Sequence, residues 1–229
     1  MDLKIITKYK DQYKRLITED PEYDELYKWE SLKNFQDNWD IDASDFGDMY
    51  NRSLHNAESS NLWASQFFYP KQVMLDFIAH DAERVRSMFV ELFNEDEGIE
   101  RRMDHFIFHC DQLRDEMLKS NPKFQNHYHD GYRIISVYLS FHYPMVYSIY
   151  KYAEFKHLME SIHARPVPGT GEIGRFFRVM RTIYGKLAQD EELLKIHRAL
   201  RADVKYYQDE SLLLAQDFYW CSARYIDRT

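Results

Sequence analysis

Two pairs of histidines have the side-chain type and the spacing that metal chemistry uses. His127 and His129 stand two residues apart just before a helical segment, and side chains two apart in an extended stretch point the same way. His105 and His109 stand four apart on one helix face, next to Cys110. Neither pair has a third ligand at metal-site spacing, and His or Asp residues beside a helix start are commonly caps and turn formers. We therefore expect no metal site in this chain.

A glycine-rich string, Gly169-x-Gly171-x-x-Gly174, has the spacing of a phosphate-binding loop. Such a loop follows a buried strand, but the preceding residues ARPVP do not form one, and Glu172 stands where a pyrophosphate would bind. No GxxxxGK[ST], GxSxG or HExxH string occurs, nor an HxE with a PCxxC. We therefore expect a flexible loop here, no cofactor, and no enzymatic activity in this chain.

Residues 165–205 concentrate positive charge in an acidic chain. The whole chain has 30 Lys and Arg against 38 Asp and Glu, a net charge of −8. This window holds nine basic and five acidic residues, so it is +4 while the remaining 188 residues are −12. Arg175, Arg178 and Arg181 follow at three-residue steps and so run along one side of a helix. Arginine suits bidentate contact with phosphate, although pairing with the acidic remainder of the protein is the alternative.

Six residues of this window form the candidate DNA-binding set. They are Arg175, Arg178, Arg181, Lys186, Arg198 and Tyr184. The basic side chains would neutralise phosphates, and the tyrosine would either stack on a base or belong to the helical core. The net charge of the whole chain opposes sequence-independent DNA binding, because phosphate contact needs a basic field.

The elements that must position these residues are helices. Apolar residues recur at three- and four-residue steps nearly throughout, and the chain has only 7 Gly and 6 Pro. We predict an all-α, mainly helical single domain of nine to ten helices, with at most one small β-hairpin near 145–152, where β-branched and aromatic residues gather. We place a helical core at 1–163 and a C-terminal helical part of the same domain at 172–229, joined by the loop 164–171.

Nine side chains on the apolar helical stripes are expected to be largely buried. They are Trp29, Phe35, Phe89, Phe93, Phe106, Ile135, Leu139, Leu213 and Phe218. The first residues, MDLKIITKYKDQYKRL, alternate charged and apolar side chains and do not form a signal peptide. No apolar run approaches the ~18 residues that a membrane span needs, and two cysteines are too few for a disulfide framework. We therefore expect a cytoplasmic protein without a membrane partner.

Four strings carry a resemblance to a known family. They are DELYKWESLKNFQDNWD (24–40), ERVRSMFVELFNED (83–96), HYHDGYRIISVYLSFHYPMVYSIYKYAEFKHL (127–158) and SLLLAQDFYW (211–220). In this order and spacing the chain resembles the helical N-terminal region that stands ahead of the AAA+ motor in some McrB-type modification-dependent restriction NTPases. The match extends over about residues 20–225, and its strings are structural in character, not catalytic.

The resemblance implies a role in restriction and anti-phage defence. In McrB-type systems the N-terminal region recognises DNA, often modified DNA, while the motor hydrolyses GTP or ATP and a partner nuclease cuts. Walker motifs are absent from this chain, so NTPase activity would lie in an associated AAA+ motor. The first interpretation is thus a DNA-binding specificity module. The alternative is a helical protein-interaction or regulatory module without nucleic-acid binding, and a continuous positive face formed by the arginines of 165–205 would favour the first.

Overall fold

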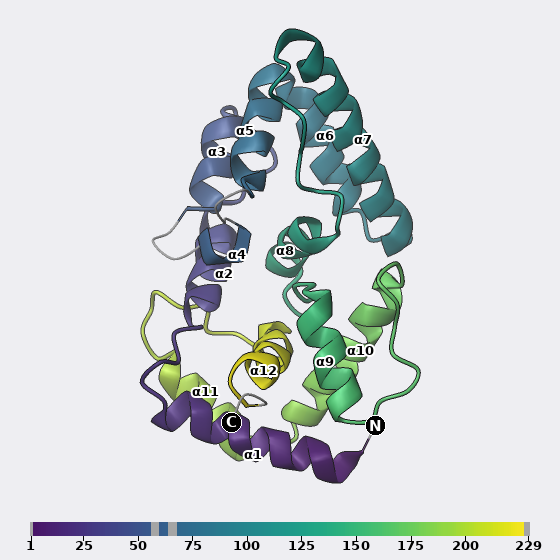
Figure 1. Ribbon diagram of the computed structural model, residues 1–229. Helices are drawn as coiled ribbons and strands as arrows, with labels where there is room; N and C mark the ends of the chain where they lie inside the picture. Colours follow the sequence, from purple (N-terminus) through teal and green to yellow (C-terminus); the bar gives the residue numbers. More distant parts are fainter. Residues whose placement is uncertain (1, 56–59, 64–67, 227–229) are drawn as a thin grey trace. The chain divides into compact units, whose positions relative to one another are not determined.

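The computed structural model describes residues 2–55, 60–63 and 68–226. The regular elements of this part are helices, numbered α1 to α12 (Figure 1), and helix accounts for 65% of the described residues. The predicted all-α class is confirmed. The helices outnumber the nine to ten expected, because single-turn segments such as α4 (Ser60–Trp63) are too short to show an apolar period in the sequence.

The sequence allows at most one small β-hairpin near 145–152, and the structure has no strand in this segment. Two backbone groups of this segment form hydrogen bonds with a side chain, where in a sheet they would pair with a second strand. The hydroxyl of Tyr219 donates to the carbonyl of Ile149 at 2.7 Å and accepts from the backbone N–H of Lys151 at 3.2 Å. The aromatic and β-branched residues here, such as Tyr147, fill the core without forming a sheet.

The chain divides into two compact units, and neither boundary falls in the loop 164–171. Unit 1 comprises residues 1–29 and 143–229, and unit 2 comprises residues 30–142. Unit 2 is therefore an insertion between two parts of unit 1 in the sequence. The first boundary lies within α2 (Tyr27–Asn38).

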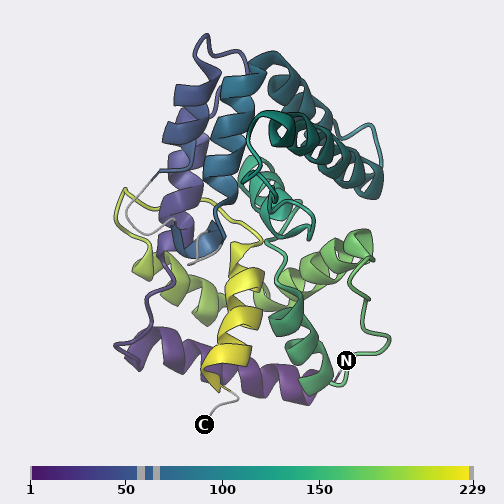
Figure 2. The same ribbon diagram turned by 45° about the horizontal axis from the view of Figure 1, so that its top comes forward.

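Helix α12 (Leu213–Arg224) is the centre of unit 1 and is drawn in yellow in Figures 1 and 2. It packs against α1 (Leu3–Glu19), α9 (Tyr152–Ser161) and α10 (Ile173–Leu187). Helix α1 also contacts α11 (Glu191–Leu200). Every residue of α12 from Leu213 to Tyr219 is buried, which is typical of a helix enclosed on all sides.

A buried polar group at the centre of unit 1 is fully paired. The carboxylate of Asp217 accepts hydrogen bonds from Lys28 at 2.7 Å, Tyr13 at 2.6 Å and Tyr23 at 2.9 Å. Lys28 also lies 2.9 Å from the carboxylate of Glu25. Burying charges costs several kcal/mol unless they are paired and hydrogen-bonded, so these partners let α12 carry an ionised residue in the core.

Unit 2 contains the remaining helices. They are α3 (Phe46–Ser53), α4, α5 (Pro70–His80), α6 (Ala82–Leu92), α7 (Ile99–Ser120) and α8 (Arg133–His142), together with most of α2. Helix α3 packs against α5 and α6, and α6 packs against α7. Phe89 is in ring contact with Phe106 and Tyr138 at centroid distances of 5.2 and 5.1 Å, which joins α6, α7 and α8 in one aromatic core.

The nine predicted core residues are all buried, with exposed fractions between 0 and 8%. The helical phases inferred from the apolar stripes are therefore confirmed. In the described part of the chain, no helix combines the length and the apolar character that crossing a membrane requires.

Candidate functional site

Helix α10 separates an apolar face from a basic face. The buried side is made of Ile173, Phe176, Phe177, Met180, Ile183, Tyr184 and Leu187. The other side carries Arg175, Arg178, Arg181 and Lys186, and α10 contains no acidic residue. Because one face packs in the core of unit 1, the 3.6-residue period places all four cations on the side that the core leaves open.

The three arginines of α10 have different surroundings. The side chain of Arg178 is exposed and has no hydrogen bond or ion pair within the part of the chain that the structure describes. Arg175 pairs with Glu172 one turn earlier, and Arg181 donates to the backbone carbonyl of Val146 at 2.9 Å. Arg178 is therefore the cation most available to an outside anion, while its two neighbours are oriented by groups of unit 1.

The glycine-rich loop before α10 is bonded to a carboxylate of the protein itself, that of Glu172. The backbone N–H of Gly169 donates to the carboxylate of Glu172 at 2.7 Å. This bond, followed by the contact with Arg175, lowers the pKa of Glu172 below its ordinary value. The carboxylate thus occupies the position that a bound phosphate would need at the start of the helix.

Two members of the candidate set lie apart from the basic row. Tyr184 is 9% exposed and its hydroxyl donates to Glu210 at 2.6 Å, so its ring belongs to the core and is not offered to a base. The reason is its place on the apolar stripe of α10, one turn after Met180. Arg198 lies on α11, exposed, with its guanidinium 3.7 Å from the other carboxylate oxygen of Glu210. That acid reduces the positive potential which Arg198 presents.

The net charge of the chain is divided unequally between its two units. Counted over the full sequence, unit 1 has 19 Lys and Arg against 18 Asp and Glu, whereas unit 2 has 11 against 20. The excess of acid that opposes DNA binding therefore belongs to unit 2. Helix α10 lies in the unit that is close to neutral, where a row of four cations is not outweighed by its own surroundings.

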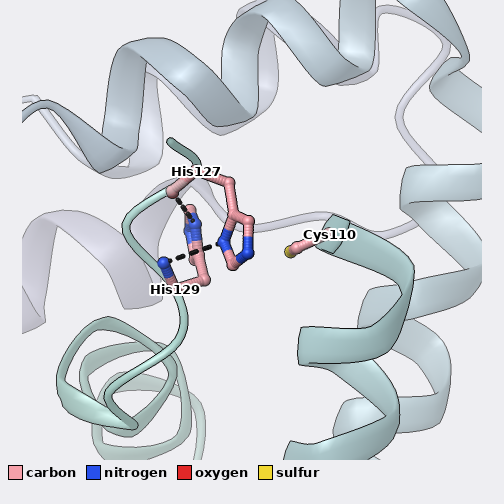
Figure 3. A group of neighbouring side chains, drawn as sticks. All are labelled: Cys110, His127 and His129. Atoms are coloured by element: carbon pink, nitrogen blue, oxygen red, sulfur yellow. Dashed lines mark hydrogen bonds between the residues drawn. The ribbon is translucent and has the colours of Figure 1, made fainter. Parts of the chain in front are cut away.

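The structure brings Cys110 together with His127 and His129 in the core of unit 2 (Figure 3). The cysteine belongs to α7, and the histidines lie on the segment between α7 and α8. All three are buried, and Tyr128 between the histidines has a positive φ of 62°. Sequence reasoning missed the third member, because the cysteine meets the histidines only when the segment folds back on α7.

Both histidine rings of this cluster are satisfied by hydrogen bonds. His127 accepts through Nδ1 from the backbone N–H of His129 at 3.0 Å (Figure 3), and its Nε2 lies 3.2 Å from Asp111. His129 bonds through Nδ1 to the carbonyl of His127 and through Nε2 to the hydroxyl of Tyr138 at 3.1 Å. Burial above all lowers the pKa of His129 to about 3, so that ring is neutral. A metal at Nε2 of His127 would force a proton onto Nδ1, which already faces an N–H donor.

A second group of three candidate ligands lies at the surface of unit 2. Glu91 comes from α6, and His105 and His109 come from α7. One donor atom of each lies within 4.8 Å of the others. The sequence shows the histidine pair but not the carboxylate, which is supplied by the neighbouring helix.

Comparison of the chain with protein-family models, curated proteins and solved structures gives no match. The resemblance to McrB-type N-terminal regions thus rests on its four strings alone, and the function is inferred from the surface of the chain itself.

Proposed function

We propose that this chain is a DNA-binding specificity module in which the basic face of α10 contacts the phosphate backbone. The observation that carries the proposal is the row Arg175, Arg178, Arg181 and Lys186, which no acidic residue of the helix interrupts. At 1.5 Å per residue the row spans about 16 Å, close to half a turn of B-form DNA. The row is therefore long enough to follow the phosphates of a DNA backbone over about half a turn.

The nearly balanced charge of unit 1 supports the same proposal. A basic row on an acidic surface would be screened by its own neighbours, whereas this row lies in a unit with 19 basic and 18 acidic residues. Phosphate contacts supply affinity and register but do not read the sequence. In this proposal α10 anchors the DNA, and recognition of a sequence or a modified base comes from other residues.

The resemblance to McrB-type proteins supplies the context for such a module. The chain would bind DNA on behalf of an AAA+ motor, and hydrolysis and cleavage would be carried out by that motor and its nuclease. This fits a chain without the Walker motifs of an NTPase.

The test is a binding titration by fluorescence anisotropy, using labelled 20-base-pair duplexes with and without 5-methylcytosine at several salt concentrations. If three arginines each contact a phosphate, log K should fall against log salt with a slope of about −3. Replacing Arg175, Arg178 and Arg181 together by Ala should remove most of the binding and flatten that slope. The fold should remain, since exposed charged positions usually change stability by less than about 0.5 kcal/mol.

A matched control removes the same charge from unit 2. The variant R52A/K119A/K123A takes three exposed bases from that unit and should bind DNA like the wild type. If the α10 variant also binds like the wild type, the basic face is not the contact surface. If no duplex binds at low salt, the protein-interaction module is the better interpretation.

A further inference from the structure

The surface group formed by Glu91, His105 and His109 has the geometry of a three-ligand metal site. His105 and His109 are one helical turn apart on α7, the spacing with which two histidines on a helix chelate one ion. Glu91 approaches from α6, which packs against α7. Its carboxylate lies 2.7 Å from Nδ1 of His105.

One ring nitrogen of this group has no hydrogen-bond partner among the described residues. The Nδ1 atom of His109 is buried and has no hydrogen bond within the described residues. Buried polar atoms are nearly always satisfied, so an orphaned imidazole nitrogen needs an explanation. The buried cluster around His127 shows no such orphan among its ring nitrogens.

The cations around the group are held by other partners. Arg84 is bound to Glu116 at 2.9 Å, Arg101 to Glu97 at 2.9 Å, and Arg102 to Glu95 at 2.7 Å. Among the described residues no arginine is paired with the carboxylate of Glu91, which lies against His105. Glu91 is about half exposed, at 52%, and so is His105, at 49%. Both line a surface cavity of about 230 Å³, which leaves room for water beside an ion.

We propose that Glu91, His105 and His109 form a binding site for one divalent transition-metal ion of the zinc class. Two imidazoles and one carboxylate are ligands that Zn²⁺ accepts, and an all-oxygen set would be expected for Ca²⁺ or Mg²⁺. Three protein ligands leave a fourth position open to water or to an outside group. On binding, the ion would take the place of the hydrogen on Nδ1 of His105, and that hydrogen would move to Nε2 of the same ring. This departs from the absence of metal expected from the sequence, because α6 supplies the missing third ligand.

The site is independent of the proposed DNA contact, since it lies in unit 2 and uses none of the residues of α10. Its test uses the full, untagged chain freed of metal. Zn²⁺ is titrated in competition with a chromophoric chelator, and the optical spectrum is recorded with Co²⁺ as a substitute ion. We expect one ion per chain. We also expect a Co²⁺ spectrum without a thiolate charge-transfer band, because Cys110 is not a ligand.

Three variants locate the ion. E91Q and H105A change exposed side chains, so they should stay folded, and each should weaken Zn²⁺ binding at least tenfold, since even the loss of an outer-shell partner costs a metal site about 10–100-fold. H80A removes an exposed histidine of α5 that pairs with Glu116, and it should bind Zn²⁺ like the wild type. The proposal is overturned if the wild type binds no stoichiometric Zn²⁺, or if E91Q and H105A bind it unchanged. A thiolate band with Co²⁺ would also overturn it, in favour of the cluster around Cys110.

Discussion

Lys28 and Asp217 are 189 positions apart in the sequence and form an ion pair of 2.7 Å in which neither side chain is exposed. The pair ties the first turn of α2 to α12, the helix against which α1, α9 and α10 pack. Asp217 also accepts the hydroxyls of Tyr13 and Tyr23, so one carboxylate satisfies three buried or partly buried donors.

Removing the carboxylate should therefore be costly. Asp217→Ala leaves the buried Lys28 charge and the Tyr13 hydroxyl without their main acceptor, and the free energy of unfolding should fall by about 3–5 kcal/mol. Urea denaturation followed by far-UV circular dichroism measures this loss. Asp209→Ala, an exposed change in the same unit, should stay within about 0.5 kcal/mol. A loss below about 1 kcal/mol for Asp217→Ala would show that the network does not hold unit 1 together.

Two buried histidines should make stability depend on pH. Burial lowers the pKa of His129 and of His197 to about 3, with further lowering by the charges of His127 and Arg201 respectively. An unfolded histidine titrates near 6.5, so between about pH 6.5 and 3 the unfolded chain binds more protons than the folded one. The free energy of unfolding should fall as the pH decreases through this range, by at most about 1.4 kcal/mol per pH unit for each histidine.

Urea denaturation at pH 7, 6 and 5 measures this dependence. The variant His197→Asn should be less stable at pH 7 but lose less stability on acidification than the wild type, because one of the two titrating groups is gone. His55→Asn removes an exposed histidine and should follow the wild-type pH profile. Identical profiles for His197→Asn and the wild type would contradict this assignment.

The sequence predicted those parts of the fold that depend on local periodicity. The stripe that buries Phe176, Met180 and Ile183 also leaves Arg175 and Arg178 on the opposite side, and both facts follow from a 3.6-residue repeat. The β-branched and aromatic residues near 145–152 do not form a strand, because strand propensity describes how residues fit a half-buried surface and does not supply a second strand to pair with. In the structure the backbone of that segment is satisfied by Tyr219, a residue about 70 positions further along.

The two clusters of potential metal ligands could be predicted only in part, because their members come from different elements. His105 and His109 are recognisable as neighbours on one helix, but Glu91 joins them only through the packing of α6 on α7. His127 and His129 meet Cys110 through a segment in which Tyr128 has a positive φ. Residues other than glycine seldom adopt a positive φ, so no local sequence pattern predicts this conformation at Tyr128.

Trp29 should be a major contributor to the core of unit 1. It is 1% exposed, its ring lies 4.6 Å from the ring of His197, and the guanidinium of Arg201 lies 5.6 Å above it. Trp29→Ala should lower the free energy of unfolding by about 3–5 kcal/mol, through lost burial and the cavity left behind. Thermal denaturation measures the change. Val204→Ala, at a side chain that is 81% exposed, serves as the control and should leave the melting temperature nearly unchanged.

Arg178 and Arg198 should differ in their effect on DNA binding. The side chain of Arg178 has no partner within the described residues, whereas the guanidinium of Arg198 lies 3.7 Å from the carboxylate of Glu210. Arg178→Ala should weaken binding to every duplex alike and reduce the magnitude of the salt slope by about 1. Arg198→Ala should change the slope less, because its charge is already partly compensated. Equal slopes for the two variants in the anisotropy titration would argue against α10 as the contact surface.

The discontinuous sequence of unit 1 has a consequence for synthesis on the ribosome. Residues 30–142 are made in one uninterrupted stretch, so unit 2 has all of its chain before α9 to α12 are translated. Unit 1 must wait for α12, and until then α1 and Lys28 lack the helix against which they pack. A nascent chain therefore passes through a state in which unit 2 can fold while unit 1 is still incomplete. In that state the apolar side of α1 is the surface that a chaperone would meet.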